Sequence, residues 1–503
     1  MSDHGSFTDD LDHDWTEGDP VENAKRRRKP AIASVVIAAL LAVCVAAGAV
    51  VIGLTGLLPS WLLAVMVVVD AAVACVMVVL LFTSGPSRRK ARFWVATVLS
   101  VLLMAGNAAM AWAGGVYLNT TSAIQPPTSD TILYDIVVLD DTATQVSQLD
   151  QSLMGEVGGD PLAAVVHGQV LARVKVTFAP SPSWPAMVDS LKAEDVSSMV
   201  IQDGFMQVLS DADPDTYGRL RILDSFEVDT SLATTPTPTP TSKPTSEPTN
   251  GYVLYISGMD TYGSIKTRAR SDVNILMVVN PSTGKILLVN TPRDFYVQLR
   301  GTTGLPDKLT HSGVYGIDVS VGTMEDLYGI TIDYYLRINF NSLIAVIDAL
   351  GGVDVDSAYD FSLGGYSFHV GANHLDGAAA LAFSRDRYDF EGGDRVRGQN
   401  QERVIEAIIK KASQPSVLVN YDQIMASVQD SIQTSMPQDV ISAQVRQQVF
   451  SGQKWNVTSI SVDGVGDMDY TYTYPEERLY VMVPDQSTVD LAEKMIQATL
   501  AGQ

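Results

Sequence analysis

Cysteine, histidine and positive charge are scarce in this sequence of 503 residues. The two cysteines, Cys44 and Cys75, both lie in apolar runs, so no disulfide framework or cysteine-based zinc site is expected outside those runs. The six histidines are scattered, and the neighbouring His369 and His374 lack a third ligand, which predicts that both lie on the surface. A formal net charge of −23 argues against nucleic acid as a partner of the whole chain.

Long apolar runs follow a polar, acidic N-terminal stretch. Residues 1–30 are expected to form a cytoplasmic tail that is disordered in its acidic part and ends in KRRRK. Each of the apolar runs is long enough for a membrane helix, which needs about 20 residues; the runs are Ala31–Leu54, Trp61–Thr83 and Phe93–Gly115. A cleaved signal peptide has one shorter apolar core, so residues 31–115 are predicted to be a membrane anchor of three transmembrane helices.

The basic residues around these helices predict an orientation. KRRRK precedes the first run and SRRKAR (Ser87–Arg92) joins the second to the third, whereas Thr55–Ser60 carries no charge. The positive-inside rule then places the N-terminus in the cytoplasm and everything after Gly115 outside the cell. A tail of about 30 residues also leaves no room for a DNA-binding fold.

Residues 131–230 are predicted to form a small extracellular α/β accessory domain. Its strand-like runs are Ile132–Asp140, Val170–Phe178 and Leu220–Val228, and helical patterns fill Ala186–Leu209. The segment contains no chemical motif, which indicates a spacer or a contact module. Residues 231–250, rich in Pro and Thr, are predicted to be an extended linker.

The last domain, residues 251–503, opens with three runs of branched apolar residues. Tyr252–Ser257, Val273–Val279 and Lys285–Val289 have the composition of buried strands. Asn280–Gly284, between the second and third, has the composition of a hairpin turn. We therefore expect an antiparallel meander.

In a meander, the end of the first strand, the start of the second and the end of the third share one edge. The residues at that edge are Asp260, Arg270, Asp272, Arg293 and Asp294. Carboxylates with open positions suit Mg²⁺, which phosphate oxygens of a substrate usually complete, and arginine forks suit the same phosphates. The alternative is that these charges form solvated ion pairs at loop ends.

Further arginines occur at predicted loops and element ends of this acidic region. Arg385 and Arg387 follow a short helix, and Arg397 lies in a predicted loop, Tyr388–Gln401. So many arginines in loops indicate an anionic ligand with several phosphate oxygens. Ordinary surface pairing with the many acidic residues is the alternative.

The ordered set of motifs resembles the LytR–CpsA–Psr family of bacterial cell-wall proteins. The resemblance spans roughly Gly251–Lys411 and rests on Asp260 with Asp272, RSD (Arg270–Asp272), PRD (Pro292–Asp294), a lone Lys308, Arg385 with Arg387, and Asp394-x-x-Arg397-x-x-x-Gln401. The three apolar runs and the extra module are similar to a capsule-type member. Asn290, where the family often has Ser, and LTHSGVYG after Lys308 depart from the pattern.

The resemblance implies a mixed β-sheet flanked by helices, with an apolar pocket for a polyprenyl chain. It also implies an enzyme that transfers a glycopolymer, capsule or teichoic acid, from polyprenyl pyrophosphate to peptidoglycan. Mg²⁺ or Mn²⁺ would be the cofactor. Membrane, lipid-linked polysaccharide and peptidoglycan would be the partners.

The resemblance also implies roles for individual residues. Asp260 and Asp272 would bind the metal, and they would form the catalytic set with Asp394 and Arg397. Either Asp260 or Asp394 would take the proton of the acceptor hydroxyl. The substrate-binding residues would be Arg270, Arg293, Lys308, Arg385, Arg387, Arg397 and Gln401.

Two other functions fit the same residues. A polyprenyl-pyrophosphate hydrolase would use water as the acceptor at the same site. A non-enzymatic sensor would bind the lipid-linked phosphate without Mg²⁺-dependent turnover, although every charged residue that the family's site requires is present.

Overall fold

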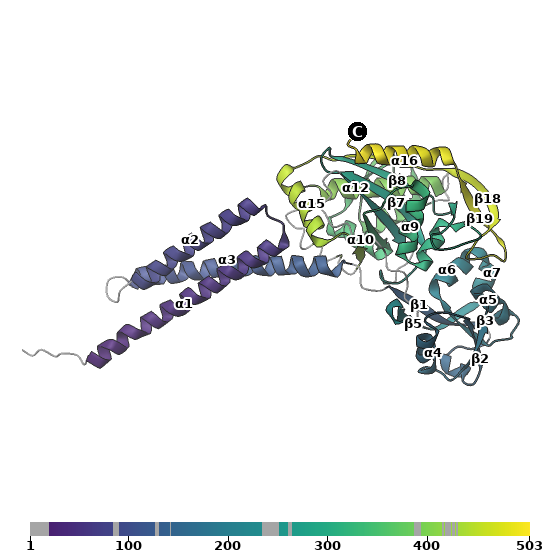
Figure 1. Cartoon of the computed structure of the whole chain (residues 1–503), viewed down its shortest axis with the longest axis horizontal. Helices are drawn as coiled ribbons and strands as arrows, with labels where there is room; N and C mark the ends of the chain where they lie inside the picture. Colours follow the sequence, from purple (N-terminus) through teal and green to yellow (C-terminus); the bar gives the residue numbers. More distant parts are fainter. Residues whose placement is uncertain are drawn as a thin grey trace, which may run out of the picture. The chain divides into compact units, whose positions relative to one another are not determined.

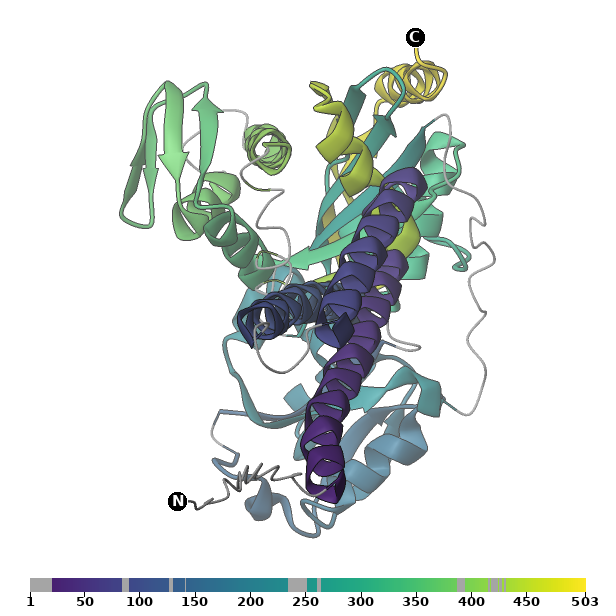
Figure 2. The same ribbon diagram turned by 90° about the vertical axis from the view of Figure 1, so that its left-hand side faces the viewer.

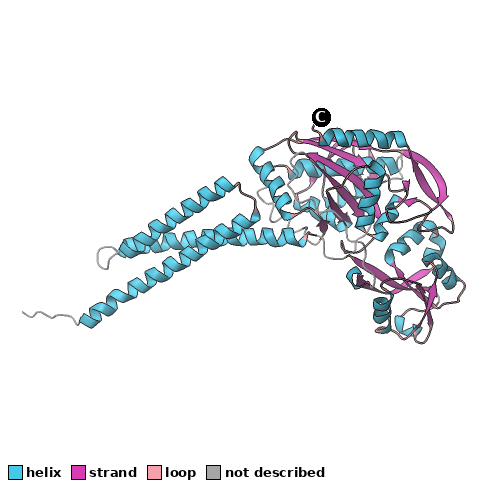
Figure 3. Ribbon diagram, in the orientation of Figure 1, coloured by secondary structure: helices cyan, strands magenta, loops and turns pink. Residues whose placement is uncertain are grey.

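The structure is a computed structural model. It describes residues 20–83, 90–125, 130–140, 142–233, 251–259, 264–386, 394–414, 417, 424, 428 and 431–503. The chain forms two compact units, residues 1–118 and 119–503. The first unit is helical, and the second mixes helices with strands (Figure 3).

Three long helices make up the described part of the first unit: α1 (Pro20–Thr55), α2 (Ser60–Thr83) and α3 (Lys90–Ala123), which runs on into the second unit. Three apolar stretches are long enough to cross a membrane: Ile32–Thr55, Ser60–Thr83 and Ala91–Ala123. The three predicted helices are therefore present. The third extends beyond the predicted end at Gly115.

The accessory domain contains a five-stranded sheet with strand order β3-β2-β4-β1-β5. Its strands are β1 (Thr131–Leu139), β2 (Leu153–Val157), β3 (Thr177–Ser181), β4 (Ser198–Gln202) and β5 (Leu220–Asp229). Its helices are α4 (Ala163–Leu171), α5 (Trp184–Lys192), α6 (Asp203–Ala212) and the single-turn α7 (Pro214–Tyr217). The interior strand β1 pairs antiparallel with both β4 and β5, whereas β2 is parallel to β3 and β4.

Two predictions for this domain were wrong. Only Thr177 and Phe178 of the predicted strand Val170–Phe178 lie in a strand, the start of β3. Its first two residues end α4, where Val166 and Val170 lie one turn apart and are both buried. The predicted helical stretch Ala186–Leu209 contains the strand β4, whose first four residues are all buried. A short apolar run buried on both faces has no periodicity that separates strand from helix.

The predicted meander is confirmed as the centre of residues 251–503, the predicted catalytic domain. Strands β6 (Tyr252–Met259), β7 (Ser271–Asn280) and β8 (Lys285–Asn290) pair antiparallel in sequence order. They lie within a six-stranded mixed sheet of order β16-β11-β6-β7-β8-β17. Figure 1 labels its neighbouring strands β7 and β8. The added strands are β11 (Tyr334–Asn339), parallel to β6, β16 (Ile432–Thr434) and β17 (Asn456–Ser461), parallel to β8.

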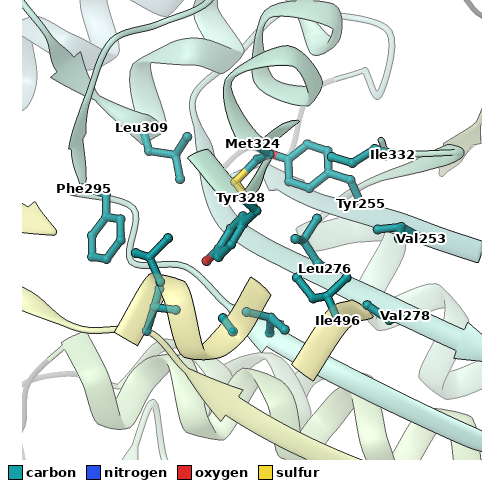
Figure 4. Packing of buried hydrophobic residues seen from close by; sticks show 14 of the residues in the cluster. Val253, Tyr255, Leu276, Val278, Phe295, Leu309, Met324, Tyr328, Ile332 and Ile496 are labelled. Atoms are coloured by element: carbon teal, nitrogen blue, oxygen red, sulfur yellow. The ribbon is translucent and has the colours of Figure 1, made fainter. Parts of the chain in front are cut away.

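Helices cover both faces of this sheet because successive strand residues alternate between two apolar clusters. On one face, Tyr255 and Leu276 pack against α9 (Ile317–Tyr328) and α16 (Gln486–Leu500), through residues such as Tyr328 and Ile496 (Figure 4). On the other face, the cluster includes residues of α12 (Asp394–Ala412) and α15 (Gln438–Ser451).

A small side lobe lies next to α12. It contains α10 (Phe340–Ala349), α11 (Gly377–Arg385) and the short strands β12 (Val353–Ser357), β13 (Phe361–Leu363), β14 (Tyr366–Phe368) and β15 (Gly371–Leu375). Figure 2 shows these strands, in light green, to one side of the central sheet. The helix α12 begins at Asp394, so the predicted loop Tyr388–Gln401 is wrong over its second half.

The accessory domain and the catalytic domain share one compact unit and one apolar cluster. Trp184 and Leu209 of the accessory domain pack with Val314, Tyr474 and Leu479 of the catalytic domain. The backbone of Thr131 bonds to that of Lys266 and Arg268. The buried Arg337 of β11 lies 3.2 Å from Asp130, which precedes β1.

Candidate active site

The edge of the meander brings together the acidic and basic residues that the sequence placed there. Nη1 of Arg293 lies 3.2 Å from Oδ2 of Asp272, and Nη2 of Arg270 lies 4.0 Å from the same atom. Asp272 is the second residue of β7, and Arg293 follows the end of β8. Asp260, the other predicted metal ligand, lies outside the described residues.

The environment of Asp272 keeps its carboxylate ionised. Burial alone would raise the pKa of Asp272, but the guanidiniums of Arg293 and Arg270 outweigh it and hold the pKa well below its usual range. The hydroxyl of Thr310 also donates to Oδ1 at 2.7 Å. Asp272 is therefore a fixed negative charge rather than a proton acceptor.

Arg270 is held by the accessory domain. Its Nη1 donates to the backbone oxygen of Gln207 at 3.2 Å and also contacts the carboxylate of Asp211. Both residues belong to α6, and Asp211 lines the same cavity as Arg270. The sequence offered no signal for this role, because α6 lies in a different domain and carries no motif.

Asp294 and Lys308 form a buried pair next to Arg293. Nζ of Lys308 lies 2.5 Å from Oδ1 of Asp294, and Nε of Arg293 lies 3.6 Å from Oδ2. Burial would raise the pKa of Asp294, but Lys308 and Arg293 lower it below its usual range. Lys308 lines neither of the two cavities of the site. The position of Lys308 suits a role in orienting Asp294 and Arg293. The predicted contact between Lys308 and the substrate stays a prediction.

A cavity of about 300 Å³ opens at this edge of the sheet. Its walls are apolar, and its charged residues gather around Arg270 and Asp272. The apolar lining comes from Met259, Val273, Ile338, Phe340, Leu343, Leu381, Val404 and Ile405, and the charged lining from Asp211, Arg270, Asp272, Arg293, Arg385 and Arg397.

Arg385 reaches the cavity from the last turn of α11. Its guanidinium carbon lies 4.4 Å from the ring centroid of Phe340, a cation–π distance. Asp376 is the N-cap of this helix and accepts a hydrogen bond from Ala379 N at 2.8 Å, which fixes the start of α11. Arg387 lies outside the described residues.

Arg397 and Gln401 line the cavity from one face of α12, four residues apart. Arg397 lowers the pKa of both Asp272 and Asp294, which confirms its proximity to the two carboxylates. Both residues also line an adjoining cavity of about 20 Å³ together with Asp272. The side chain of Asp394, at the start of α12, lies outside what the structure describes.

Glu402 is a further acidic residue that the sequence did not single out. It is 4% exposed, and Ser461 Oγ donates to its Oε1 at 3.4 Å. Burial raises its pKa to about 7. Nothing in the sequence distinguishes Glu402 from Glu406, the half-buried other glutamate of α12, because the burial of Glu402 depends on packing against β17.

The described residues contain no group of three or more His, Cys, Asp or Glu side chains that could hold a metal ion. The donors that are described nevertheless fit a hard cation in part. Oδ2 of Asp272 is buried and accepts no hydrogen bond from the described residues. A cation such as Mg²⁺ needs only one or two carboxylates when phosphate and water complete its shell.

The lining of this cavity indicates the chemical class of its ligand. An apolar cavity with arginines at its mouth suits an amphiphile with a long apolar tail and a phosphate-bearing head. A sequence model described as the LytR_cpsA_psr family matches residues 225–487. The chain belongs to this family.

Named relatives give the same family. A protein of Bacillus mycoides (strain KBAB4), named polyisoprenyl-teichoic acid–peptidoglycan teichoic acid transferase TagU, is 32% identical over 249 residues, 48% of this chain and 77% of that protein. A protein of the same name from Oceanobacillus iheyensis is 35% identical over 205 residues, 39% of this chain and 63% of that protein. The crystal structure of B. subtilis TagV has a TM-score of 0.43 at 28% identity, covering 50% of this chain and 98% of that one.

Proposed function

We propose that this protein is a membrane-anchored phosphotransferase that moves a glycopolymer, of the capsule or teichoic-acid type, from polyprenyl pyrophosphate to peptidoglycan. The observation that carries the proposal is the arginine lining of the apolar cavity. Arg293, Arg270 and Arg397 act on one ionised carboxylate, Asp272, and Arg385 lines the same cavity. The relatives named as teichoic acid transferases support the same reaction.

The chemistry follows from what the arginines can stabilise. The acceptor hydroxyl of the wall sugar attacks the phosphorus that carries the glycopolymer. A new phosphodiester forms, the bond from that phosphorus to the bridging oxygen breaks, and polyprenyl phosphate leaves. Negative charge develops on the phosphoryl and leaving oxygens, and fixed guanidinium donors stabilise it without reorganisation. The hydroxyl proton must go to a base, and Asp260 and Asp394 are the predicted candidates.

We further propose that Asp272, together with Asp260, holds Mg²⁺ or Mn²⁺, which would neutralise pyrophosphate oxygens when bound. The buried Oδ2 of Asp272 is ion-paired with Arg293 but accepts no hydrogen bond from the described residues, and this geometry and the low pKa of Asp272 support the assignment. The charge asymmetry of the loops supports a cytoplasmic N-terminus with the catalytic domain outside the cell, where peptidoglycan lies.

The test is transfer of a lipid-linked glycopolymer to peptidoglycan by the full-length chain in detergent. Arg385→Ala removes a charge-assisted contact worth on the order of 1.5–3 kcal/mol, so affinity for the donor should fall roughly ten- to a hundred-fold. Arg385→Lys should restore little of it, because an ammonium lacks the planar fork. Asp272→Ala should abolish Mg²⁺-dependent turnover.

Arg221→Ala is the matched control, because Arg221 is an exposed arginine of β5 that pairs with Asp140 outside the cavity. Wild-type turnover in folded Arg385→Ala and Asp272→Ala would contradict the site. Release of the polymer phosphate to water, with no gain from added peptidoglycan, would instead identify a hydrolase. Donor binding with no turnover under any condition would identify a sensor.

A further inference from the structure

A second cavity, of about 360 Å³, lies where the accessory domain meets the catalytic domain. It is lined by β2, β4, α5 and α6 of the accessory domain and by Tyr315, Tyr472 and Thr473 of the catalytic domain. It shares no lining residue with the arginine-rich cavity. Its volume falls within the range of small-molecule sites, which also favour domain interfaces.

One wall of this cavity is built from aromatic rings. Trp184 and Phe205 stack with their centroids 5.4 Å apart and their planes 11° from parallel. Tyr315 meets Phe205 edge-on at 6.3 Å, and Tyr472 lies 6.1 Å from Tyr315. Trp184 is anchored, since its Nε1 donates to Thr473 O at 3.0 Å. Tyr472 is 40% exposed, so the aromatic wall combines an anchored ring, Trp184, with a solvent-exposed ring, Tyr472.

Other lining residues of this cavity carry acidic and amide groups. Tyr134 donates to Asp160 Oδ2 at 2.7 Å, and Gln202 Nε2 donates to the Tyr134 oxygen at 3.3 Å. Glu156 pairs with His167 and also lines the cavity. Neither lysine nor arginine is among the lining residues of the described chain. Two carboxylates in a wall without lysine or arginine disfavour a phosphate or a phosphodiester.

We propose that this cavity binds an uncharged pyranose ring of a glycan. A pyranose presents one face of C–H groups, which packs on aromatic rings, and a rim of hydroxyls, which donate to carboxylates and amide oxygens. The cavity offers both surfaces and repels anions. The site rests on the proposed function for its role, which is to hold one sugar of a chain whose neighbour reacts at the arginines.

Two elements connect the cavity to the arginine-rich site. Helix α6 carries Phe205 into the cavity and, at its other end, the Asp211 that contacts Arg270. These residues are six positions apart, about 9 Å along a helix. The segment from Thr310 to Tyr315 likewise joins a hydrogen bond on Asp272 to a ring in the cavity wall. A short run of sugars is long enough to span the roughly 9 Å between these two ends of α6.

The same ring chemistry occurs in the acceptor glycan and in the sugar part of the donor polymer. Binding is first measured with chitotetraose, an uncharged glycan, by saturation-transfer difference NMR on the full-length chain in detergent. We expect binding in the wild type, at least a ten-fold loss in Tyr472→Ala and in Phe205→Leu, and no loss in Tyr217→Ala. Tyr217 is equally exposed, at 40%, but lies outside the cavity.

No binding by the wild type, or equal binding by folded Tyr472→Ala and Phe205→Leu, would overturn the proposal. Asp272→Ala separates it from the proposed function, because this variant should bind chitotetraose normally while losing transfer. If the wild type binds the glycan but shows no transfer, the sugar site stands and the proposed transferase function is wrong. If the wild type shows transfer but does not bind the glycan, the transferase function stands and the sugar site is wrong.

The source of the sugar follows from the kinetics of transfer. If the cavity holds the acceptor, Tyr472→Ala raises the KM for peptidoglycan glycan and leaves the KM for the lipid-linked donor unchanged. If it holds the donor polymer, the donor KM rises instead. Unchanged values for both substrates would contradict the role of the cavity in transfer.

Discussion

At the scale of single residues, the charge on Arg270 is shared between two carboxylates from different domains. Asp211 contacts its guanidinium from α6, and Asp272 lies 4.0 Å from it on β7. The backbone oxygen of Gln207 holds Nη1 independently of either carboxylate. Asp211 therefore adds negative charge at a mouth that is proposed to bind phosphate.

Asp211→Asn should tighten donor binding. The substitution removes a repulsion worth about 1 kcal/mol at close range in a largely solvated mouth, which corresponds to a roughly five-fold lower Kd. The measurement is calorimetric titration of the full-length chain with a polyprenyl pyrophosphate. Asp224→Asn, at an exposed partner of Arg173, is the control and should not change the Kd. Weaker binding in Asp211→Asn would show that Asp211 orients Arg270 instead.

Glu402 should make stability depend on pH. Its pKa is raised from 4.5 to about 7 in the folded protein, so the folded state keeps a proton that the unfolded state releases between these values. The free energy of unfolding should therefore fall as pH rises through this window, by on the order of 3 kcal/mol, and change little above it. Glu402→Gln should remove this fall.

The measurement is the melting temperature of wild type and Glu402→Gln from pH 5 to pH 8. The melting temperature of Glu402→Gln should rise relative to that of the wild type as pH rises. The melting temperature of Glu227→Gln, at an exposed position of β5, should change with pH as that of the wild type does. Parallel curves for Glu402→Gln and wild type would contradict the burial of an uncharged carboxyl group.

The sequence predicted which residues of the catalytic domain meet, but not what surrounds them. Asp272 and Arg293 converge because strand order in a meander fixes which ends share an edge. Asp211 could not be found in this way, since nothing local couples α6 to β7. Thr310 and Glu402 depend on how a loop and a helix face pack onto the finished sheet, and a single sequence carries no such signal.

At the scale of elements, the short helix α8 (Ser312–Tyr315) lies directly against the start of β7. A Cβ atom on Gly313 would meet the carbonyl oxygen of Ala269 and the backbone nitrogen of Ser271 closer than packed atoms allow. This close approach holds the segment that presents Thr310 to Asp272 and Tyr315 to the second cavity.

Gly313→Ala should destabilise the protein by about 1–3 kcal/mol, because neither backbone atom can move without shifting β7. It should also lower turnover, since the Thr310–Asp272 hydrogen bond depends on this contact. Gly168→Ala is the control of opposite sign. Gly168 lies within α4 with no atom near the added methyl, so alanine should stabilise by roughly 0.5–1 kcal/mol. Thermal unfolding of both variants tests the pair.

Elements whose apolar and turn residues form a clear sequence pattern were predicted correctly, and elements without such a pattern were not. The strands β6, β7 and β8 are branched, apolar and separated by turn residues, so both type and pairing followed. The parallel pairing of β11 with β6 depends on a distant crossover. The strand β4 lies between two helices in a continuous apolar stretch, where periodicity could not separate it.

At the scale of the whole molecule, the cysteine content allows a direct test of orientation. Cys44 and Cys75 both lie within the membrane-length helices α1 and α2. In a Cys44→Ser, Cys75→Ser background, Tyr217→Cys should react with a membrane-impermeant maleimide on intact cells. Ser6→Cys should react only after lysis. The reverse pattern would contradict the proposed placement of the catalytic domain outside the cell.

The pair between Arg337 and Asp130 has a consequence for truncation. Arg337 is 2% exposed, and Asp130 belongs to the segment that enters the accessory domain. A soluble fragment starting at Gly251 would leave a buried guanidinium without its carboxylate, at a cost of about 3–5 kcal/mol. It should melt well below a fragment starting at Asn119, and Arg337→Met should recover part of the difference. Inhibitor screens that use the shorter fragment would present Arg270 without Asp211 and would therefore select ligands for a mouth that the intact enzyme does not have.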